Sequence, residues 1–113
     1  TLDEVENPAT TEVELPLLNS GEIEGARGEL SLESEAGALT SFEVDIADVP
    51  AGDYDLKVGG VLKGTITVVD VDGELSGEIE FNNDGSGVPL DFDPNGQLIT
   101  VEHAGTVILS RPL

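Results

Sequence analysis

The chain has 113 residues, of which 24 are Asp or Glu and only four are Lys or Arg, giving a formal net charge of −20 at pH 7. Such a charge repels nucleic-acid phosphates and anionic membrane surfaces, so we expect no nucleic-acid partner; it attracts divalent cations and basic proteins. The absence of cysteine excludes disulfides and thiol chemistry. No apolar run approaches the ~18 residues of a membrane span, so no membrane insertion is predicted.

The N-terminal part of the chain begins without any regular alternation of apolar and polar residues. Residues 1–12 are acidic and contain Pro8, so they are predicted to form a linker or a loosely held segment ahead of one β domain over residues 13–113. Residues 13–18 are predicted to form a strand, and Pro16 places it at a sheet edge because proline cannot donate a ladder hydrogen bond. Leu30 and Leu32 alternate with polar residues and predict a second strand after a glycine-rich break.

The middle of the chain, residues 42–81, carries the clearest pattern, with apolar and polar residues alternating at period two. A long strand over residues 39–48 is predicted to point Phe42, Val44 and Ile46 inward. A further strand over residues 54–58 follows a Pro-Ala-Gly turn. This alternation indicates half-buried antiparallel strands.

Two hairpins are predicted in this stretch. A three-residue loop over residues 59–61 would pair Val58 with Leu62 and Tyr54 with Ile66, so that all apolar side chains share one face. Asp72-Gly73 predicts a type I′ turn, because both of its central positions need a positive φ. The resulting register pairs Val71 with Glu74, Ile66 with Ile79 and Phe81 with Gly64, which predicts a three-stranded meander.

The C-terminal part predicts a short strand with Val88, Leu90 and Phe92 on one face. A type I turn over residues 93–96 follows, and strands over residues 97–102 and 106–110 end the domain. This makes about eight or nine short strands with regular turn signals, which favours a single antiparallel β-sandwich over any α/β design.

The stretch Val-Pro-Ala-Gly-Asp-Tyr-Asp-Leu-Lys-Val at residues 49–58 resembles a turn and strand of immunoglobulin-like and transthyretin-like (Cna-B type) sandwich modules of secreted bacterial proteins. Tyr54 also resembles the tyrosine corner of immunoglobulin-like folds, with Gly52 two residues before it and Leu56 where a cysteine often stands. The resemblance implies an immunoglobulin-like all-β sandwich. It also implies an extracellular or cell-surface location.

One stretch matches a calcium-loop pattern. Asp91, Asp93 and Asn95, followed by Gly96 and by Glu102 after five further residues, fit D-x-[DN]-x-[DN]-G-x5-E. Oxygens at alternate positions of a tight loop can converge on one cation, so these three residues are the predicted metal ligands. An ordinary β-turn is the alternative. No helix is expected on either side of the motif, and an extended strand would place Glu102 ~17 Å from Gln97, too far to bind the same ion.

No catalytic residue is predicted. His103 is the only histidine, and no serine or activated carboxylate beside it in the sequence forms a dyad. The chain contains no methionine, so we expect a processed protein or a segment of a longer one. We therefore expect a non-enzymatic structural or interaction module of a larger exported or cell-surface bacterial protein, with a protein or divalent cation as partner and no cofactor unless calcium binds.

Two alternatives to this function remain. The first is a calcium-dependent adhesion or binding module. The second is a small hydrolase that uses acidic residues, which a cleft holding two carboxyl groups of raised pKa would support.

Overall fold

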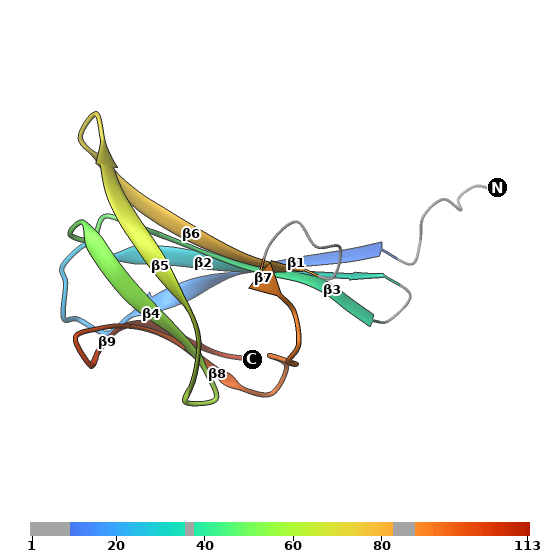
Figure 1. Ribbon diagram of the computed structural model, residues 1–113. Coiled ribbons are helices and arrows are strands. Elements are labelled where there is room, and N and C mark those ends of the chain that lie inside the picture. The colour runs from blue at the N-terminus through green and yellow to red at the C-terminus, as the bar shows by residue number, and fades with distance from the viewer. Residues whose placement is uncertain (1–9, 36–37, 83–87) are drawn as a thin grey trace.

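The computed structural model describes residues 10–35, 38–82 and 88–113, which form an all-β fold (Figure 1). Within these residues the structure contains strands and no helix. No helix is therefore present that could span a membrane in the described part of the chain. The strands are β1 (Thr10–Asn19), β2 (Arg27–Glu35), β3 (Ala38–Ala47), β4 (Gly52–Val58), β5 (Val61–Val71), β6 (Glu74–Asn82), β7 (Val88–Pro89), β8 (Leu98–His103) and β9 (Thr106–Pro112).

Eight of these strands form a closed antiparallel barrel. Following the pairings gives the order β1-β2-β3-β6-β5-β4-β8-β9, after which β9 pairs with β1 again. The two-residue strand β7 lies parallel to the end of β6. The predicted all-β, antiparallel class is thus confirmed, but the predicted sandwich is wrong, because the sheet closes on itself.

The barrel closes because two long strands change partner along their length. β5 pairs with β4 through its first part, up to Val68, and with β6 only through Val69–Val71. β1 pairs with β2 over residues 10–17 and with β9 at Leu18 and Asn19. Alternation in a sequence specifies which face of a strand is buried, but not which strand lies beside it. This is why the pattern fitted a sandwich equally well.

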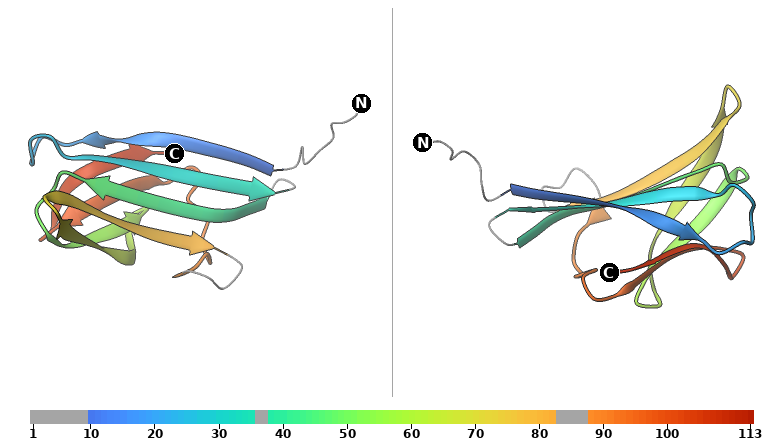
Figure 2. Two further views of the ribbon diagram at one scale, coloured as in Figure 1. Left: turned by 90° about the horizontal axis from the view of Figure 1, so that it is seen from above. Right: turned by 180° about the vertical axis from the view of Figure 1, so that it is seen from behind.

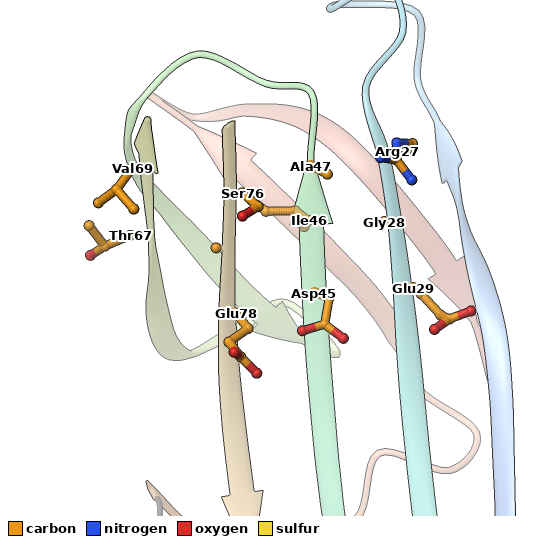
Figure 3. Close-up of a pocket in the computed structure, with 11 residues that line it drawn as sticks. Arg27, Gly28, Glu29, Asp45, Ile46, Ala47, Thr67, Val69, Ser76 and Glu78 are labelled. Carbon is orange, nitrogen blue, oxygen red and sulfur yellow. The ribbon is translucent and has the colours of Figure 1, made fainter. Parts of the chain in front are cut away.

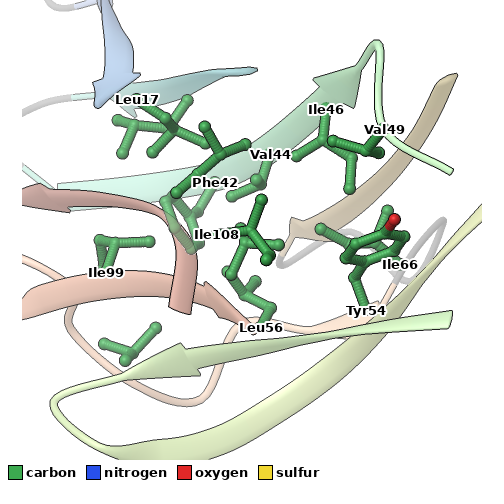
Figure 4. Close-up of a cluster of buried hydrophobic side chains, with 14 of the residues drawn as sticks. Leu17, Phe42, Val44, Ile46, Val49, Tyr54, Leu56, Ile66, Ile99 and Ile108 are labelled. Atoms are coloured by element: carbon green, nitrogen blue, oxygen red, sulfur yellow. The ribbon is translucent and has the colours of Figure 1, made fainter. Parts of the chain in front are cut away.

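The interior is filled by apolar residues from each of the eight barrel strands (Figure 4). Phe42 and Phe81 stack with ring centroids 5.8 Å apart, and Phe92 packs edge-on against both rings. The predicted inward positions of β3 and β4 are confirmed as buried. The completely buried side chains are Leu30, Phe42, Val44, Tyr54, Leu56, Ile66, Ile99, Val101 and Leu109.

The β4–β5 hairpin differs from the prediction at its turn. Val58 pairs with Val61 across a two-residue Gly59-Gly60 turn, where both glycines have a positive φ (61° and 84°). A bulge next to Leu56 then absorbs the extra residue of β5, so the predicted pairing of Tyr54 with Ile66 is retained. Leu62, predicted to face the core, is instead 56% exposed.

The β5–β6 hairpin confirms the predicted Asp72-Gly73 turn, since both residues have a positive φ (54° and 88°) and Val71 pairs with Glu74. The ladder ends at Val69, however, because β6 continues as the partner of β3. Ile66 therefore does not pair with Ile79. Phe81 still approaches Gly64, with its Cζ atom 3.5 Å from the position that a Cβ would take, although these two residues do not pair.

The ends of the domain agree with the prediction only in part. β1 begins at Thr10, inside the predicted N-terminal segment, and residues 1–9 lie outside the described residues. The predicted strand through Val88, Leu90 and Phe92 is limited to β7. The next turn spans Pro94–Gln97, with a hydrogen bond of 3.1 Å from the Gln97 N–H to the Pro94 carbonyl and a positive φ of 78° at Gly96. That φ at the third position fits a type II turn, so the predicted type I turn is wrong.

Candidate functional site

The outer side of β2, β3 and β6 concentrates negative charge, because outward positions of these adjacent strands are acidic. The register sets Glu29 beside Asp45 and Asp45 beside Glu78, and it sets Glu43 beside Glu80 on the next outward row. We call this surface the acidic face. Its carboxylates are Glu29, Glu33, Glu43, Asp45, Glu78 and Glu80.

Three of these carboxyl groups lie close together. Glu43, Asp45 and Glu78 each place a carboxyl oxygen within 4.8 Å of the others. A hydrogen bond to Glu78, helped by burial and by the neighbouring negative charges, raises the pKa of Glu43 to about 7. Burial, together with the charges of Glu78 and Glu29, also raises the pKa of Asp45. Near neutral pH a proton is therefore bound between two carboxyl groups in part of the molecules, and a bound cation could replace it.

A hollow of about 770 Å³ lies beside the cluster (Figure 3). Asp45 and Glu78 lie next to each other at one end of it, and Arg27 lies at the other end, where it forms an ion pair of 2.6 Å with Asp48. Thr67 and Val69 of β5 line the side. The hollow lies where the β5–β6 ladder ends, at the pair Val69↔Ser76.

Gly77 permits the close approach of β5 and β6. A Cβ at Gly77 would lie against the carbonyl oxygen of Thr67, and 2.9 Å from its carbonyl carbon. The backbone of β6 can therefore pass under β5 only without a side chain at this position. The lining combines three carboxylates (Glu29, Asp45 and Glu78), two hydroxyl groups and one exposed apolar side chain, Val69, while Arg27 at the far end is already paired with Asp48. The carboxylate end suits a ligand that is cationic at its end and aliphatic along its stem.

The predicted calcium ligands lie on a different part of the surface. Asp91, Asp93 and Asn95 are exposed in the loop before β8. The Asp93 Oδ1 atom accepts hydrogen bonds of 3.0 Å from both the backbone N–H and the side-chain amide of Asn95. Glu102 lies in β8, where it forms an ion pair of 3.1 Å with Lys57. Calcium binding by the three loop residues stays a prediction.

The only histidine packs on the predicted tyrosine corner. The Tyr54 hydroxyl donates a hydrogen bond of 2.6 Å to the Pro50 carbonyl oxygen, four residues upstream. The His103 ring lies 4.8 Å from the Tyr54 ring, and His103 Nδ1 lies 3.2 Å from the Asp53 carbonyl oxygen. These contacts hold the His103 side chain against the start of β4.

No family model matches the chain, and the comparison with curated proteins finds no significant match either. The resemblance of residues 49–58 to immunoglobulin-like and Cna-B type modules therefore has no support beyond the all-β antiparallel class. What the fold and the site define together is a closed eight-stranded barrel with one strongly acidic face.

The acidic cluster was missed in the sequence because its members come from separate strands. Glu43 and Asp45 are two residues apart, but Glu78 lies more than 30 residues further along the chain. One signal was present in the sequence: residues 42–46 (Phe-Glu-Val-Asp-Ile) and 77–81 (Gly-Glu-Ile-Glu-Phe) both have acidic residues at every second position. Only the pairing of β3 with β6 turns these two runs into one surface.

Proposed function

We propose that this barrel is a non-enzymatic interaction module of a larger exported or cell-surface bacterial protein, and that its acidic face binds a basic segment of a partner protein. The observation that carries the proposal is the cluster of Glu43, Asp45 and Glu78 at the edge of the hollow. A raised pKa at Glu43 means that the cluster holds less than its full negative charge at neutral pH. A cationic ligand would stabilise the fully ionised cluster.

A lysine side chain matches the hollow in shape and chemistry. Its ammonium group could reach Asp45 and Glu78, while its aliphatic stem lies along Val69, which is 50% exposed. Long basic side chains often cover apolar surface in this way. A partner with several lysines or arginines would in addition benefit from the charge of −20 on the whole chain, which accelerates association.

The proposal is tested by binding of a lysine-rich peptide, measured by calorimetry at low and high salt. The triple variant Glu43→Gln, Asp45→Asn, Glu78→Gln is compared with a control triple of equal charge, Glu22→Gln, Glu24→Gln, Asp72→Asn, which lies in the β1–β2 and β5–β6 turns. We expect the acidic-face triple to bind about tenfold more weakly than the control triple, a difference of about 1.4 kcal/mol. Equal weakening in both triples would show that only the net charge matters and would contradict the proposal.

Divalent cation binding is the second candidate function, and the spacing of the three carboxyl oxygens favours it. Calcium should then raise the melting temperature beyond the effect of monovalent salt at equal ionic strength. Loss of this response in Glu78→Gln, with retention in Asp93→Ala, assigns calcium to the acidic face. The reverse result assigns it to the predicted loop, and no response in the unaltered protein removes the candidate.

The raised pKa values of Glu43 and Asp45 also bear on the hydrolase alternative. The two carboxyl groups of a glycosidase lie on either side of the scissile bond, roughly 5 to 9 Å apart. Here Glu43 is hydrogen-bonded to Glu78, and Asp45 lies beside both, which leaves no room for a sugar between them. We therefore retain the non-enzymatic proposal; glycoside hydrolysis that is lost in Glu43→Gln would overturn it.

A further inference from the structure

Within the described part of the chain, one edge of β1 lacks a partner strand over most of its length. β1 pairs with β2 over residues 10–17, but on its other side it meets β9 only at Leu18 and Asn19. Among the residues that the structure describes, no strand pairs with this second edge over residues 10–17. The right-hand view in Figure 2 shows the N-terminal half of β1 extending past the body of the barrel together with β2 and β3.

The direction of the free peptide groups follows from the contacts at the end of the strand. Successive peptide groups of a strand point to opposite sides, and the Ser20 N–H donates to the Ile108 carbonyl of β9 over 3.0 Å. Even-numbered residues of β1 therefore direct their N–H and C=O groups to the β9 side. Glu12 and Glu14 offer both groups at the free edge, whereas Pro16 has no N–H to offer.

The side chains around this edge define the partner. On the outer side, Glu12 and Glu14 are exposed, and Glu12 pairs with Glu33 of β2. On the inner side, Val13 is 41% exposed and Leu15 is half-buried. A strand added here would therefore place alternate residues beside carboxylates and beside apolar side chains.

We propose that the free edge of β1 binds an extended segment of a partner protein in which Lys or Arg alternates with apolar residues. Main-chain hydrogen bonds to Glu12 and Glu14 give the affinity, and the two rows of side chains give the specificity, as in β-strand addition generally. A second copy of this chain does not fit, because antiparallel pairing centred on Val13 would set Glu12 of one copy opposite Glu14 of the other. The sign of the partner's charge rests on the proposed function; the pairing along the edge does not.

The first test is amide exchange by nuclear magnetic resonance, with a nine-residue peptide of alternating lysine and valine as the probe. In the free protein, the Glu12 and Glu14 amides should exchange faster than those of Thr11 and Val13, which face β2. Binding should slow the exchange of Glu12 and Glu14 by at least about tenfold. A block peptide of the same composition, five lysines followed by four valines, should give no such protection. Binding without protection of Glu12 and Glu14 overturns the proposal.

The second test separates the backbone from the charge. Glu14→Ala and Glu14→Pro remove the same carboxylate, but only Glu14→Pro removes the N–H at the free edge. Because Pro16 already occupies an equivalent position, Glu14→Pro leaves the ladder with β2 intact. We expect Glu14→Pro to bind the alternating peptide at least about tenfold more weakly than Glu14→Ala.

Equal affinities of these two variants overturn edge pairing and leave the acidic face untouched as a binding surface. A different outcome is also possible: the acidic-face triple weakens binding no more than its control triple, while Glu14→Pro still binds the peptide more weakly than Glu14→Ala. That result overturns the proposed function and leaves edge pairing in place.

Discussion

The two junctions that close the barrel are built differently. The long junction, between β3 and β6, contains seven residue pairs, from Ser41↔Asn82 to Ala47↔Ser76. The short junction, between β1 and β9, contains two in the described part of the chain, Leu18↔Ser110 and Asn19↔Leu109. The inner side of the long junction carries the stacked aromatic pair of the core, whereas Leu18 of the short junction is 52% exposed. The long junction thus supports the fold, and the short junction leaves an edge free for a partner.

The largest difference between the junctions should appear when a core side chain is removed. Phe42→Ala removes a completely buried ring from the long junction and should lower the free energy of unfolding by about 3–5 kcal/mol. The matched change at the short junction, Leu18→Ala, should cost about 0.5 kcal/mol, because that side chain is already exposed. Urea denaturation measures both, and similar losses would contradict the contrast.

A smaller effect is expected at Gly77 of β6, beside the point where the β5–β6 ladder ends. Gly77→Ala would place a methyl group against the Thr67 carbonyl and 3.0 Å from Ile66 Cγ2, so it should cost about 1–3 kcal/mol. Ser76→Ala, at the exposed neighbouring position, serves as the control and should change little. Thermal melts of the two variants provide the comparison; an unchanged melting temperature in Gly77→Ala would show that β5 can move away freely.

The short junction can be weakened through its polar contacts. The Ser20 hydroxyl donates a hydrogen bond of 2.7 Å to the Val107 carbonyl oxygen beside the last pairs of β1 and β9. Ser20→Ala should lower the free energy of unfolding by about 0.5–1 kcal/mol and speed amide exchange at Ser20. Ser20→Thr retains the hydroxyl and should preserve both values. A loss in Ser20→Ala as large as that in Phe42→Ala would show that the short junction is as important to the fold as the long one.

The outer side of the long junction should make the stability depend on pH. The pKa of Glu43 is raised from 4.5 to about 7, so the folded protein binds a proton here that the unfolded chain has released. Stability from this group is present below the unfolded pKa and falls as the pH rises from about 4.5 to about 7. Glu43→Gln should flatten this part of the stability–pH curve, measured by urea denaturation at several pH values. Glu33→Gln leaves the Glu43–Glu78 pair in place and should retain the slope; a slope unchanged in Glu43→Gln would assign it to other groups.

The candidate site was much less predictable than the strands that carry it. The alternation around Tyr54 and Phe42 predicted which side chains are buried, and the structure confirms both. The same alternation places Glu43 and Glu78 outside, yet nothing in the sequence brings them together. The predicted cation ligands were chosen by local spacing at Asp91 and Asp93, because only local spacing can be read from one sequence.

The sequence alone determined the faces of the strands and the Asp72-Gly73 turn, since both follow from period-two burial and from the φ values that single residues tolerate. Tertiary structure decided that the sheet closes and which carboxylates become neighbours. The physical reason is that the partner of each strand depends on where β1 and β5 bend away from their first neighbours. Such bends depend on contacts between strands, some of them far apart in the chain, as at Leu18 of β1 and Ser110 of β9.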